Sequence, residues 1–434
     1  MPEDAAGTQS DRPANRPALH LTTRSGWIND PMGLTYHDGR YHMFFQYVPA
    51  QILWGPQCWW GHAVSEGLLS WTECEPILRP GDGDGGCWSG SLAVDDAGRA
   101  TIFYTSVQLD DLDLGQIRTA QPDDLTWNTW QKGPFVDGIK PTSDIMVFRD
   151  PQVSRDANGW QMIVGAGRRD DTAVALSYRS PDLLNWTSEG EFASRSSAVR
   201  DPVWTGKVWE CPQLITIGNK HVLLFSVWEP QILHYEAYAI GSVSNGQFIS
   251  EKWGRLSYGD QYYAGATFSD ANGRPGIIYW LRGITDSGGL WAGAHSVPHL
   301  LRVDDSLGLI AEPHPAVGDR RGPATKIESG SSDPVALPPL ADVDWDLSPG
   351  QLATLSVSST DATPMLTMIS NDDDLQIKIA DTSWTMPLSP RVRLVFDGPV
   401  VEVFGNAGVF AAAIPVAGAR TISMTNSSGL IYPL

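Results

Sequence analysis

Three acidic residues stand in surroundings that do not suit a solvated surface acid: Asp30 in WINDPMG, Asp150 in FRDPQV and Glu210 in WECPQL. Each lies within two residues of a proline and is flanked by apolar or aromatic positions. Burial raises the pKa of a carboxyl group because it disfavours the charged form. Paired carboxyl groups with different pKa values suit cleavage of a glycosidic bond, in which one protonates the leaving oxygen and the other attacks or stabilises the anomeric carbon.

A repeat of about sixty residues gives these acids a reason to meet. A polar turn followed by an apolar strand recurs five times: HDGRYHMFFQY, DDAGRATIFYT, DANGWQMIVGA, IGNKHVLLFSV and DANGRPGIIYW. Their centres, at Phe44, Phe103, Ile163, Leu224 and Ile278, are separated by 59, 60, 61 and 54 residues. A unit of this length with several turn signals is typical of a four-stranded propeller blade. The pattern predicts an all-β, five-bladed propeller over residues 21–317, with a β-sandwich of accidentally similar strands as the alternative.

The acids occur at nearly the same phase of this repeat. Asp30 and Glu210 each precede their strand centre by 14 residues, and Asp150 precedes its centre by 13. Ser89 precedes the second centre by 14. Positions equivalent by repeat are related by rotation about a propeller axis, so the carboxylates should converge at one end of the central channel. The alternative is that each acid caps a turn within its own blade.

The remaining segments differ in texture. Residues 1–20 contain no apolar stretch and are expected to be a disordered tail. Residues 318–350 are rich in Pro, Gly, Ser and Asp, as expected of a linker. Alternation of apolar and polar residues returns in 351–434 and predicts a C-terminal β-sandwich without a catalytic cluster.

Composition narrows the possible partners. A net charge of −20 argues against nucleic acid and anionic membrane surfaces, and no apolar run is long enough for a transmembrane helix. Eighteen Trp residues suit a protein that stacks indoles on sugar rings. The four Cys lack metal-ligand spacing, so we expect no metal and no cofactor. Reduced thiols and the absence of a signal sequence favour a cytoplasmic location, with a secreted mature form as the alternative.

Six short motifs in order make the chain resemble glycoside hydrolase family 32, which comprises invertases, inulinases, levanases and fructosyltransferases. They are WINDP from Trp27, FFQY from Phe44, WGHA from Trp60, WSGS from Trp88, FRDP from Phe148 and WECP from Trp209. The segment RLVFDGPVVEVFGNAG, residues 393–408, is similar to the signature of the family's sandwich domain. The resemblance covers the chain from about residue 20 to its end.

The resemblance implies a five-bladed propeller, a following sandwich and a role for each acid. Asp30 would be the nucleophile that forms a fructosyl-enzyme, Glu210 the general acid and then base, and Asp150 the transition-state stabiliser. A retaining mechanism would set the nucleophile and acid about 5 Å apart. The resemblance also implies a substrate pocket for a terminal fructose, shaped by Trp27, Asn29, Gln46, Trp54, Trp88, Ser89 and Arg149.

The sequence departs from the family pattern away from the acids. Met32 replaces the usual second Asn, Ser257–Asp260 reads SYGD where DYGK is common, and Pro298–Leu300 reads PHL where PRE is common. Cleavage of β-fructofuranosyl bonds in sucrose or fructans is therefore the leading hypothesis. Fructosyl transfer to a second sugar, an inverting arabinan or xylan hydrolase, and a non-catalytic carbohydrate-binding propeller are the alternatives.

Overall fold

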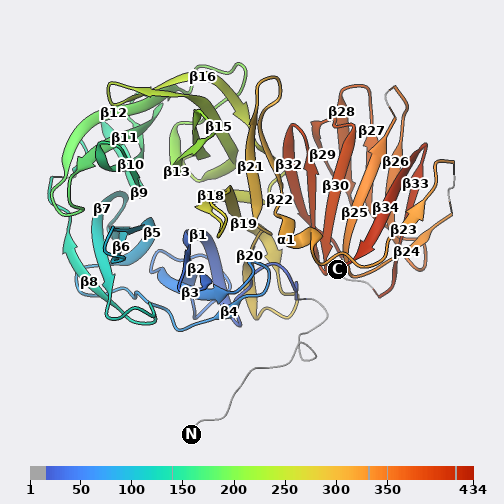
Figure 1. The fold of residues 1–434 in the computed structure, drawn as a ribbon, viewed down its shortest axis with the longest axis horizontal. Helices are drawn as coiled ribbons and strands as arrows, with labels where there is room; N and C mark the ends of the chain where they lie inside the picture. The colour runs from blue at the N-terminus through green and yellow to red at the C-terminus, as the bar shows by residue number, and fades with distance from the viewer. Residues whose placement is uncertain (1–15, 139, 331–332, 349, 416–417) are drawn as a thin grey trace, which may run out of the picture.

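The computed structural model describes residues 16–138, 140–330, 333–348, 350–415 and 418–434. Within these residues the regular structure is almost entirely β, with one short helix, α1 (Pro315–Gly318). A ring of blades lies beside a two-sheet sandwich (Figure 1). This is the predicted all-β architecture, a five-bladed propeller followed by a C-terminal sandwich.

Each blade contains four consecutive or nearly consecutive strands. The first blade consists of β1 (Gly26–His37), β2 (Arg40–Val48), β3 (Trp59–Ser65) and β4 (Thr72–Glu73). The second consists of β5 (Gly86–Val94), β6 (Ala100–Gln108), β7 (Asp111–Pro122) and β8 (Trp130–Phe135). The third consists of β9 (Ile145–Asp156), β10 (Gly159–Arg168), β11 (Thr172–Ser180) and β12 (Thr187–Ser196). The last two consist of β13 (Val208–Ile217), β14 (Lys220–Glu229), β15 (Ile232–Ser244) and β16 (Gln247–Arg255); and β18 (Tyr262–Ser269), β19 (Pro275–Thr285), β21 (His299–Asp304) and β22 (Gly308–Pro313).

The innermost strands β1, β5, β9, β13 and β18 surround the centre of the ring (Figure 1). The ring is closed by β20 (Trp291–His295), which pairs antiparallel with β19 and parallel with β1. The first and fifth blades therefore belong to one hydrogen-bonded sheet. This arrangement aims the starts of all five inner strands at one end of the channel.

Polar turns at the predicted positions connect the first two strands of the blades. Asp38 and Gly39, between β1 and β2, have φ values of 48° and 81°. Positive φ at both central residues is the geometry of a tight hairpin turn whose twist matches that of the flanking strands. The apolar residues that follow are buried, including the repeat centres Phe44, Phe103 and Leu224.

Two sheets form the sandwich. The first contains β17 (Ser257–Tyr258), β32 (Gly408–Ala413), β31 (Val400–Gly405), β30 (Arg391–Asp397), β25 (Leu340–Leu347), β34 (Ser427–Pro433) and β23 (Thr325–Ile327). The second contains β24 (Val335–Leu337), β33 (Arg420–Thr425), β26 (Thr354–Ser359), β27 (Pro364–Ser370), β28 (Asp374–Ile379) and β29 (Thr382–Pro387). Alternating side chains such as Leu355, Val357, Leu394 and Phe396 bury the core between them.

The prediction that residues 318–350 form a linker is wrong, because β23, β24 and β25 lie in this range. β25 is an interior strand that pairs with both β30 and β34. Its acids made the segment look like a loop, but Asp342 and Asp344 are buried and hydrogen-bonded to Arg321, and Asp342 also binds Arg393. Arginines outside β25 neutralise the charges that sequence composition attributes to solvent.

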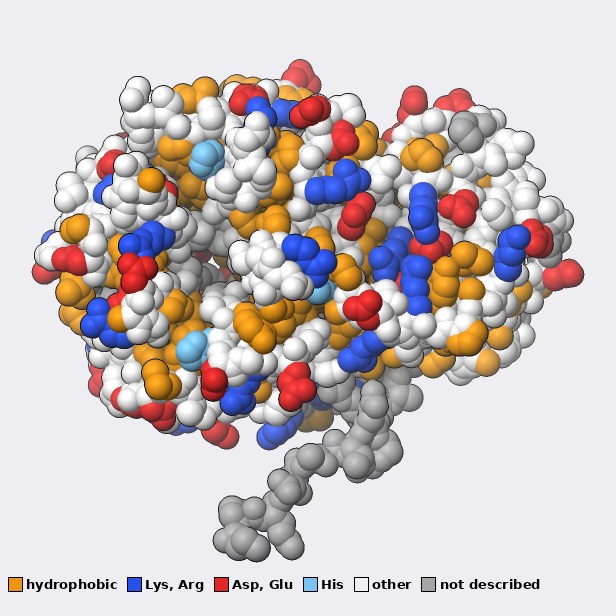
Figure 2. Space-filling model, viewed as in Figure 1, with side chains coloured by type: hydrophobic (Ala, Val, Ile, Leu, Met, Phe, Trp, Pro, Cys, Tyr) orange, Lys and Arg blue, Asp and Glu red, His pale blue; other side chains and the backbone are white. Residues whose placement is uncertain are grey.

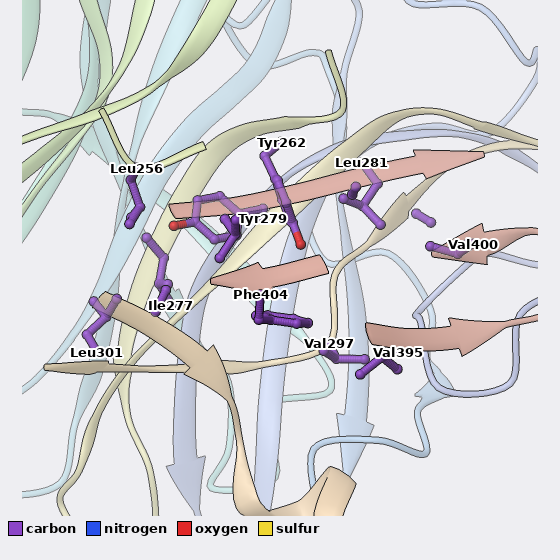
Figure 3. Close-up of a cluster of buried hydrophobic side chains, with 14 of the residues drawn as sticks. Leu256, Tyr262, Ile277, Tyr279, Leu281, Val297, Leu301, Val395, Val400 and Phe404 are labelled. Atoms are coloured by element: carbon purple, nitrogen blue, oxygen red, sulfur yellow. The ribbon is translucent and has the colours of Figure 1, made fainter. Parts of the chain in front are cut away.

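A continuous apolar core joins the fifth blade to the sandwich (Figure 3). Tyr262, Ile277 and Tyr279 from the blade lie in one buried cluster with Val395 and Phe404 from the sandwich. Separating the two units would expose this cluster to water. A large apolar interface of this kind opposes independent domain motion.

The expected tail, residues 1–20, is also partly corrected. Residues 1–15 lie outside the described residues, but Leu19 and His20 are buried. The backbone N–H groups of Ala18, Leu19 and His20 donate to the carboxylate of Asp397 at 2.6–3.0 Å. A composition-based prediction has no means of detecting a partner more than 370 residues away.

The His20 ring lies between two sandwich carboxylates, an arrangement that we call the His20 clamp. Nδ1 lies 2.7 Å from Asp397 and Nε2 lies 2.7 Å from Glu402. Burial alone would lower the pKa of His20, but the two carboxylates outweigh it and raise this pKa to about 9. The ring is therefore an imidazolium at neutral pH, and it fixes the segment that leads into β1.

Acidic and basic side chains are interspersed over the face shown in Figure 2, without a broad basic patch. This agrees with the net charge of −20. In the part of the chain that the structure describes, no helix has the length and apolar character needed to cross a membrane.

Candidate active site

A cavity of about 490 Å³ brings together the three predicted acids, Asp30 from β1, Asp150 from β9 and Glu210 from β13. Its walls combine aromatic, amide and charged side chains. They are Trp27, Asn29, Asp30, Gln46, Trp54, Trp88, Leu112, Asp113, Arg149, Asp150, Glu210, Trp228, Gln231, Leu233, Tyr263 and Trp280.

Every innermost strand has a β-bulge where it reaches this cavity. In each blade the pairing register between the first and the second strand shifts by one residue at the cavity. The shift falls at Asn29 and Asp30 in β1, and directly after Trp88, Arg149, Glu210 and Tyr263 in the other four strands. A bulge sets two residues of one strand against a single residue of its partner and redirects their side chains. In β1 and β9 two consecutive residues therefore line the cavity, Asn29 with Asp30 and Arg149 with Asp150.

The bulges arrange the site in two adjacent rings. The first ring, all of which lines the cavity, is Asn29, Trp88, Arg149, Glu210 and Tyr263. The second ring, one residue further along each strand, is Asp30, Ser89, Asp150, Cys211 and Ala264.

The two rings correct the predicted phase of the acids. Asp30 and Asp150 are equivalent, but Glu210 belongs to the other ring. Residue counting missed this because the β9–β10 and β13–β14 hairpins are one residue shorter than the β5–β6 hairpin: Gln152 pairs with Ile163, whereas Ser91 pairs with Phe103. A count of 14 therefore reaches different rings in different blades.

Asp30 is held by side chains from three blades, because Cys211 Sγ of the fourth blade also lies 3.5 Å from its Oδ2. Its Oδ1 accepts a hydrogen bond from Asn29 at 3.1 Å, and its Oδ2 accepts from Gln46 at 3.0 Å and from Ser89 at 2.5 Å. Burial raises the pKa of Asp30, the hydrogen bond from Ser89 opposes this rise, and the charge of Glu210 adds to it. Oδ1 accepts fewer hydrogen bonds than Oδ2 and is the freer oxygen.

Asp150 is fixed through its backbone and its carboxylate. Its φ of 65° lies in the left-handed region, and its N–H donates to Thr105 Oγ1 at 2.8 Å. The N–H of Cys211 donates to its Oδ2 at 3.0 Å. Burial and the charge of Glu210 raise the pKa of Asp150 to about 7, although Arg149 opposes them. Near neutral pH this side chain can donate a hydrogen bond as well as accept one.

Glu210 has a different set of partners. Nε and Nη2 of Arg149 both lie 2.9 Å from its Oε1, and the Tyr263 hydroxyl donates to its Oε2 at 2.5 Å. The Arg149 guanidinium lies 5.8 Å from the ring centre of Trp88 and 4.9 Å from that of Trp228. Glu210 is thus held by Tyr263 and by an Arg149 guanidinium that itself contacts two indole rings.

The model of the glycosyl hydrolases family 32 N-terminal domain matches residues 20–313. The chain belongs to family 32. It is 34% identical over 320 residues to sucrose-6-phosphate hydrolase of Zymomonas mobilis, an alignment that covers 67% of this chain and 60% of that protein. It is 27% identical over 471 residues to Bacillus subtilis levanase, covering 93% of this chain and 67% of the levanase. The chain thus spans only about 60% of the length of the first of these relatives.

Solved family 32 structures share the fold along the whole chain. A Bombyx mori β-fructofuranosidase in complex with sucrose has a TM-score of 0.84 at 22% identity, covering 98% of this chain and 94% of that one. A Cichorium intybus fructan 1-exohydrolase in complex with 1-kestose has a TM-score of 0.81 at 21% identity, covering 97% and 98%. At these identities the likeness concerns architecture, a propeller followed by a sandwich.

This family 32 cavity contains most of the predicted pocket residues. Of the seven expected to bind substrate, six line it: Trp27, Asn29, Gln46, Trp54, Trp88 and Arg149. Ser89 is not part of the wall and instead donates to Asp30 from behind it.

Several lining residues were missed: Leu112, Asp113, Trp228, Gln231, Leu233, Tyr263 and Trp280. Tyr263 was detectable, because the fifth repeat must also contribute to each ring. Asp113 lies near the start of β7, and Gln231 lies in the turn between β14 and β15, where no motif marks either residue. Among the described residues, no group of three or more His, Cys, Asp or Glu has an arrangement that could hold a metal ion.

Proposed function

We propose that this chain is a retaining glycoside hydrolase that cleaves β-fructofuranosyl bonds of sucrose or fructans. The observation that carries the proposal is the meeting of Asp30, Asp150 and Glu210 in one cavity of a family 32 chain. The relatives named as sucrose-6-phosphate hydrolase and levanase, and the related structures with sucrose and 1-kestose, support this substrate class.

In the first step Asp30 attacks the anomeric carbon of the fructosyl unit, and Oδ1 is the oxygen better placed to do so. Glu210 gives a proton to the glycosidic oxygen as the bond to the leaving sugar breaks. The product is a covalent fructosyl-enzyme and a free sugar. Asn29, Gln46 and Ser89 hold the nucleophile in place through the hydrogen bonds that its carboxylate accepts.

In the second step water replaces the leaving sugar. Glu210, now a carboxylate, takes a proton from the water, which attacks the anomeric carbon and releases Asp30 with overall retention. Asp150 would stabilise both transition states by hydrogen bonds to the sugar hydroxyls, which its pKa of about 7 allows it to donate or accept.

Separate incubations with sucrose, inulin and levan test this function. We expect free fructose as the main product and retention of anomeric configuration in the first-formed sugar, followed by NMR. Oligosaccharides in place of fructose would indicate transfer to a second sugar. Inversion, or turnover of arabinan or xylan alone, would overturn the assignment of Asp30 as nucleophile.

We also expect sucrose to be a better substrate than sucrose 6-phosphate. Among the described lining residues Arg149 is the one cation, and Glu210 already binds it. The exposed Asp113 contributes a further negative charge at the wall. Apposed like charges cost binding energy, so we expect kcat/KM for the phosphorylated sugar to be lower by about tenfold or more, which corresponds to about 1.4 kcal/mol.

The variant Asp113→Asn sharpens this comparison. It should raise kcat/KM for sucrose 6-phosphate, while kcat/KM for sucrose stays within a few-fold of the wild-type value. The ratio of the two kcat/KM values should therefore move closer to one. Equal turnover of both sugars by the wild-type chain would contradict the expectation.

A further inference from the structure

Two buried hydroxyl groups connect neighbouring blades directly behind the cavity. Thr105 on β6 and Ser226 on β14 are equivalent by repeat, each two residues after its strand centre, and both are fully buried. Thr105 Oγ1 accepts a hydrogen bond from the N–H of Asp150 at 2.8 Å. Ser226 Oγ accepts one from the N–H of Ala264 at 2.7 Å. Each hydroxyl thus holds a second-ring residue of the next blade.

The residues they hold have strained backbones. Asp150 and Ala264 have φ values of 65° and 52°, in the left-handed region that side-chain-bearing residues rarely adopt. Such conformations persist only where the surroundings fix them. A buried N–H without an acceptor also costs free energy. The hydroxyl oxygen therefore accepts the hydrogen bond of the N–H in the bulge and, through the same bond, restrains the backbone there.

The proton of each hydroxyl extends the connection. Thr105 Oγ1 donates to the backbone oxygen of Ser89 at 2.9 Å, so a single side chain links Ser89, the partner of Asp30, to Asp150. This bridge connects the second blade to the third. It fixes the distance between the backbone of Ser89 and the backbone of Asp150.

Ser226 makes the corresponding bridge between the fourth and fifth blades. Its Oγ donates to Glu236 Oε2 at 2.7 Å. Burial raises the pKa of Glu236 to about 8. The residue that Ser226 holds, Ala264, directly follows Tyr263, whose hydroxyl donates to Glu210. The bridge therefore acts on the acid/base residue through Tyr263.

The boundary between the third and fourth blades shows what happens where the hydroxyl is absent. The equivalent residue there is Gly165, and a Cβ atom at this position would lie 2.3 Å from the backbone oxygen of Trp209. The left-handed residue of the fourth blade, Cys211, has a φ of 46°, and its N–H donates to Asp150 Oδ2 instead. The three left-handed residues of the second ring are Asp150, Cys211 and Ala264. The backbone N–H of each therefore has a side-chain acceptor.

We propose that Thr105 and Ser226 are positioning residues of the active site, which hold the bulges that aim Asp150 and Tyr263 into the cavity. Neither lines the cavity, so neither touches substrate. The inference rests on the proposed glycosidase function for its kinetic consequence, but the geometric consequence does not depend on it.

The main test compares Thr105→Val, which keeps the shape and removes the hydroxyl, with Thr105→Ser, which keeps the hydroxyl. We expect Thr105→Val to lower kcat on sucrose at least tenfold with less than a threefold change in KM, and Thr105→Ser to retain most of the wild-type kcat. Ser226→Ala should show the same division between kcat and KM.

Thr119→Val is the matched control. Thr119 lies on β7 of the same blade, is nearly buried and donates to the backbone oxygen of Pro134, but it contacts neither ring. It should lower Tm as Thr105→Val does while leaving kcat unchanged, with all assays run well below both Tm values. A kcat for Thr105→Val equal to that of Thr119→Val would overturn the proposal.

A crystal structure of Thr105→Val gives a second readout that does not require turnover. We expect the Asp150 backbone to leave its left-handed conformation or its carboxylate to shift from the Cys211 N–H, with no such change in Thr119→Val. An unmoved Asp150 in this variant would refute the positioning role, whether or not the wild-type chain is active. Inactivity of the wild-type chain on every fructoside would count against the proposed function alone.

Discussion

The variant Asp30→Asn is expected to lose more than about 10⁴-fold in kcat, a loss of the size seen when a covalent nucleophile is removed from other hydrolases. The amide cannot form the fructosyl-enzyme, although Asn29, Gln46 and Ser89 still surround it. Steady-state hydrolysis of sucrose measures the loss. Retention of a tenth of the activity would remove Asp30 from the nucleophile's role.

The same variant should unfold at a higher temperature than the wild type at pH 7. The pKa of Asp30 is raised in the folded protein, mainly by burial, so its ionisation weakens folding as the pH rises above the value for an unfolded chain. Asn removes this cost because it carries no charge. The difference in Tm should shrink as the pH falls towards 4, where the carboxyl group of the wild type is increasingly protonated.

Asp113→Asn provides the control for both measurements. It removes a carboxylate from the wall of the same cavity, but Asp113 is exposed. Its kcat on sucrose should therefore stay within a few-fold of wild type, and its Tm should not depend on pH in the manner of Asp30→Asn. A lower Tm for Asp30→Asn across the whole range would contradict the predicted cost of burying the charge.

Glu210→Gln should produce a loss that depends on the leaving group. We expect kcat/KM on sucrose to fall by about 10³-fold, within the range for general acid–base catalysis. An aryl β-fructofuranoside, whose leaving group needs little protonation, should lose less than about tenfold, because kcat/KM reports the step that forms the fructosyl-enzyme. The amide can still accept from Arg149 and contact Tyr263, so the site keeps its shape.

Two further observations complete this experiment. The turnover of the aryl substrate should show an initial burst of released aryl group, because hydrolysis of the intermediate still lacks its base. Glu229→Gln, which alters a carboxylate outside the cavity wall, should behave as wild type on both substrates. Equal losses on sucrose and on the aryl fructoside would show that Glu210 does not act as the acid.

The sequence predicted the propeller because its repeat depends on local patterns, polar turns followed by buried strands. It also predicted that the three acids meet, since rotation relates equivalent repeats. It could not assign Glu210 to the first ring. The β13–β14 hairpin is one residue shorter than the β5–β6 hairpin, and this difference is visible only in the pairing register of the strands.

The two errors in domain boundaries share a physical cause, since both concern polar groups whose partners cannot be identified from the sequence. Asp342 and Asp344 suggested a linker because Arg321 and Arg393 could not be matched to them from the sequence. Residues 16–20 looked like a tail because their backbone donors bind Asp397 in the sandwich. Local composition describes solvent exposure well only where a segment has no such partner.

The His20 clamp has a consequence for how this architecture can be divided. The strand β1, which carries Asp30, begins six residues after His20, so it follows a point of the chain that two carboxylates of the sandwich anchor. A propeller expressed alone would keep all three acids and lose that anchor. The propeller and the sandwich of this chain are therefore not separable modules, and a chimaera that replaces the sandwich has to keep Asp397 and Glu402 as partners for the segment that precedes the first blade.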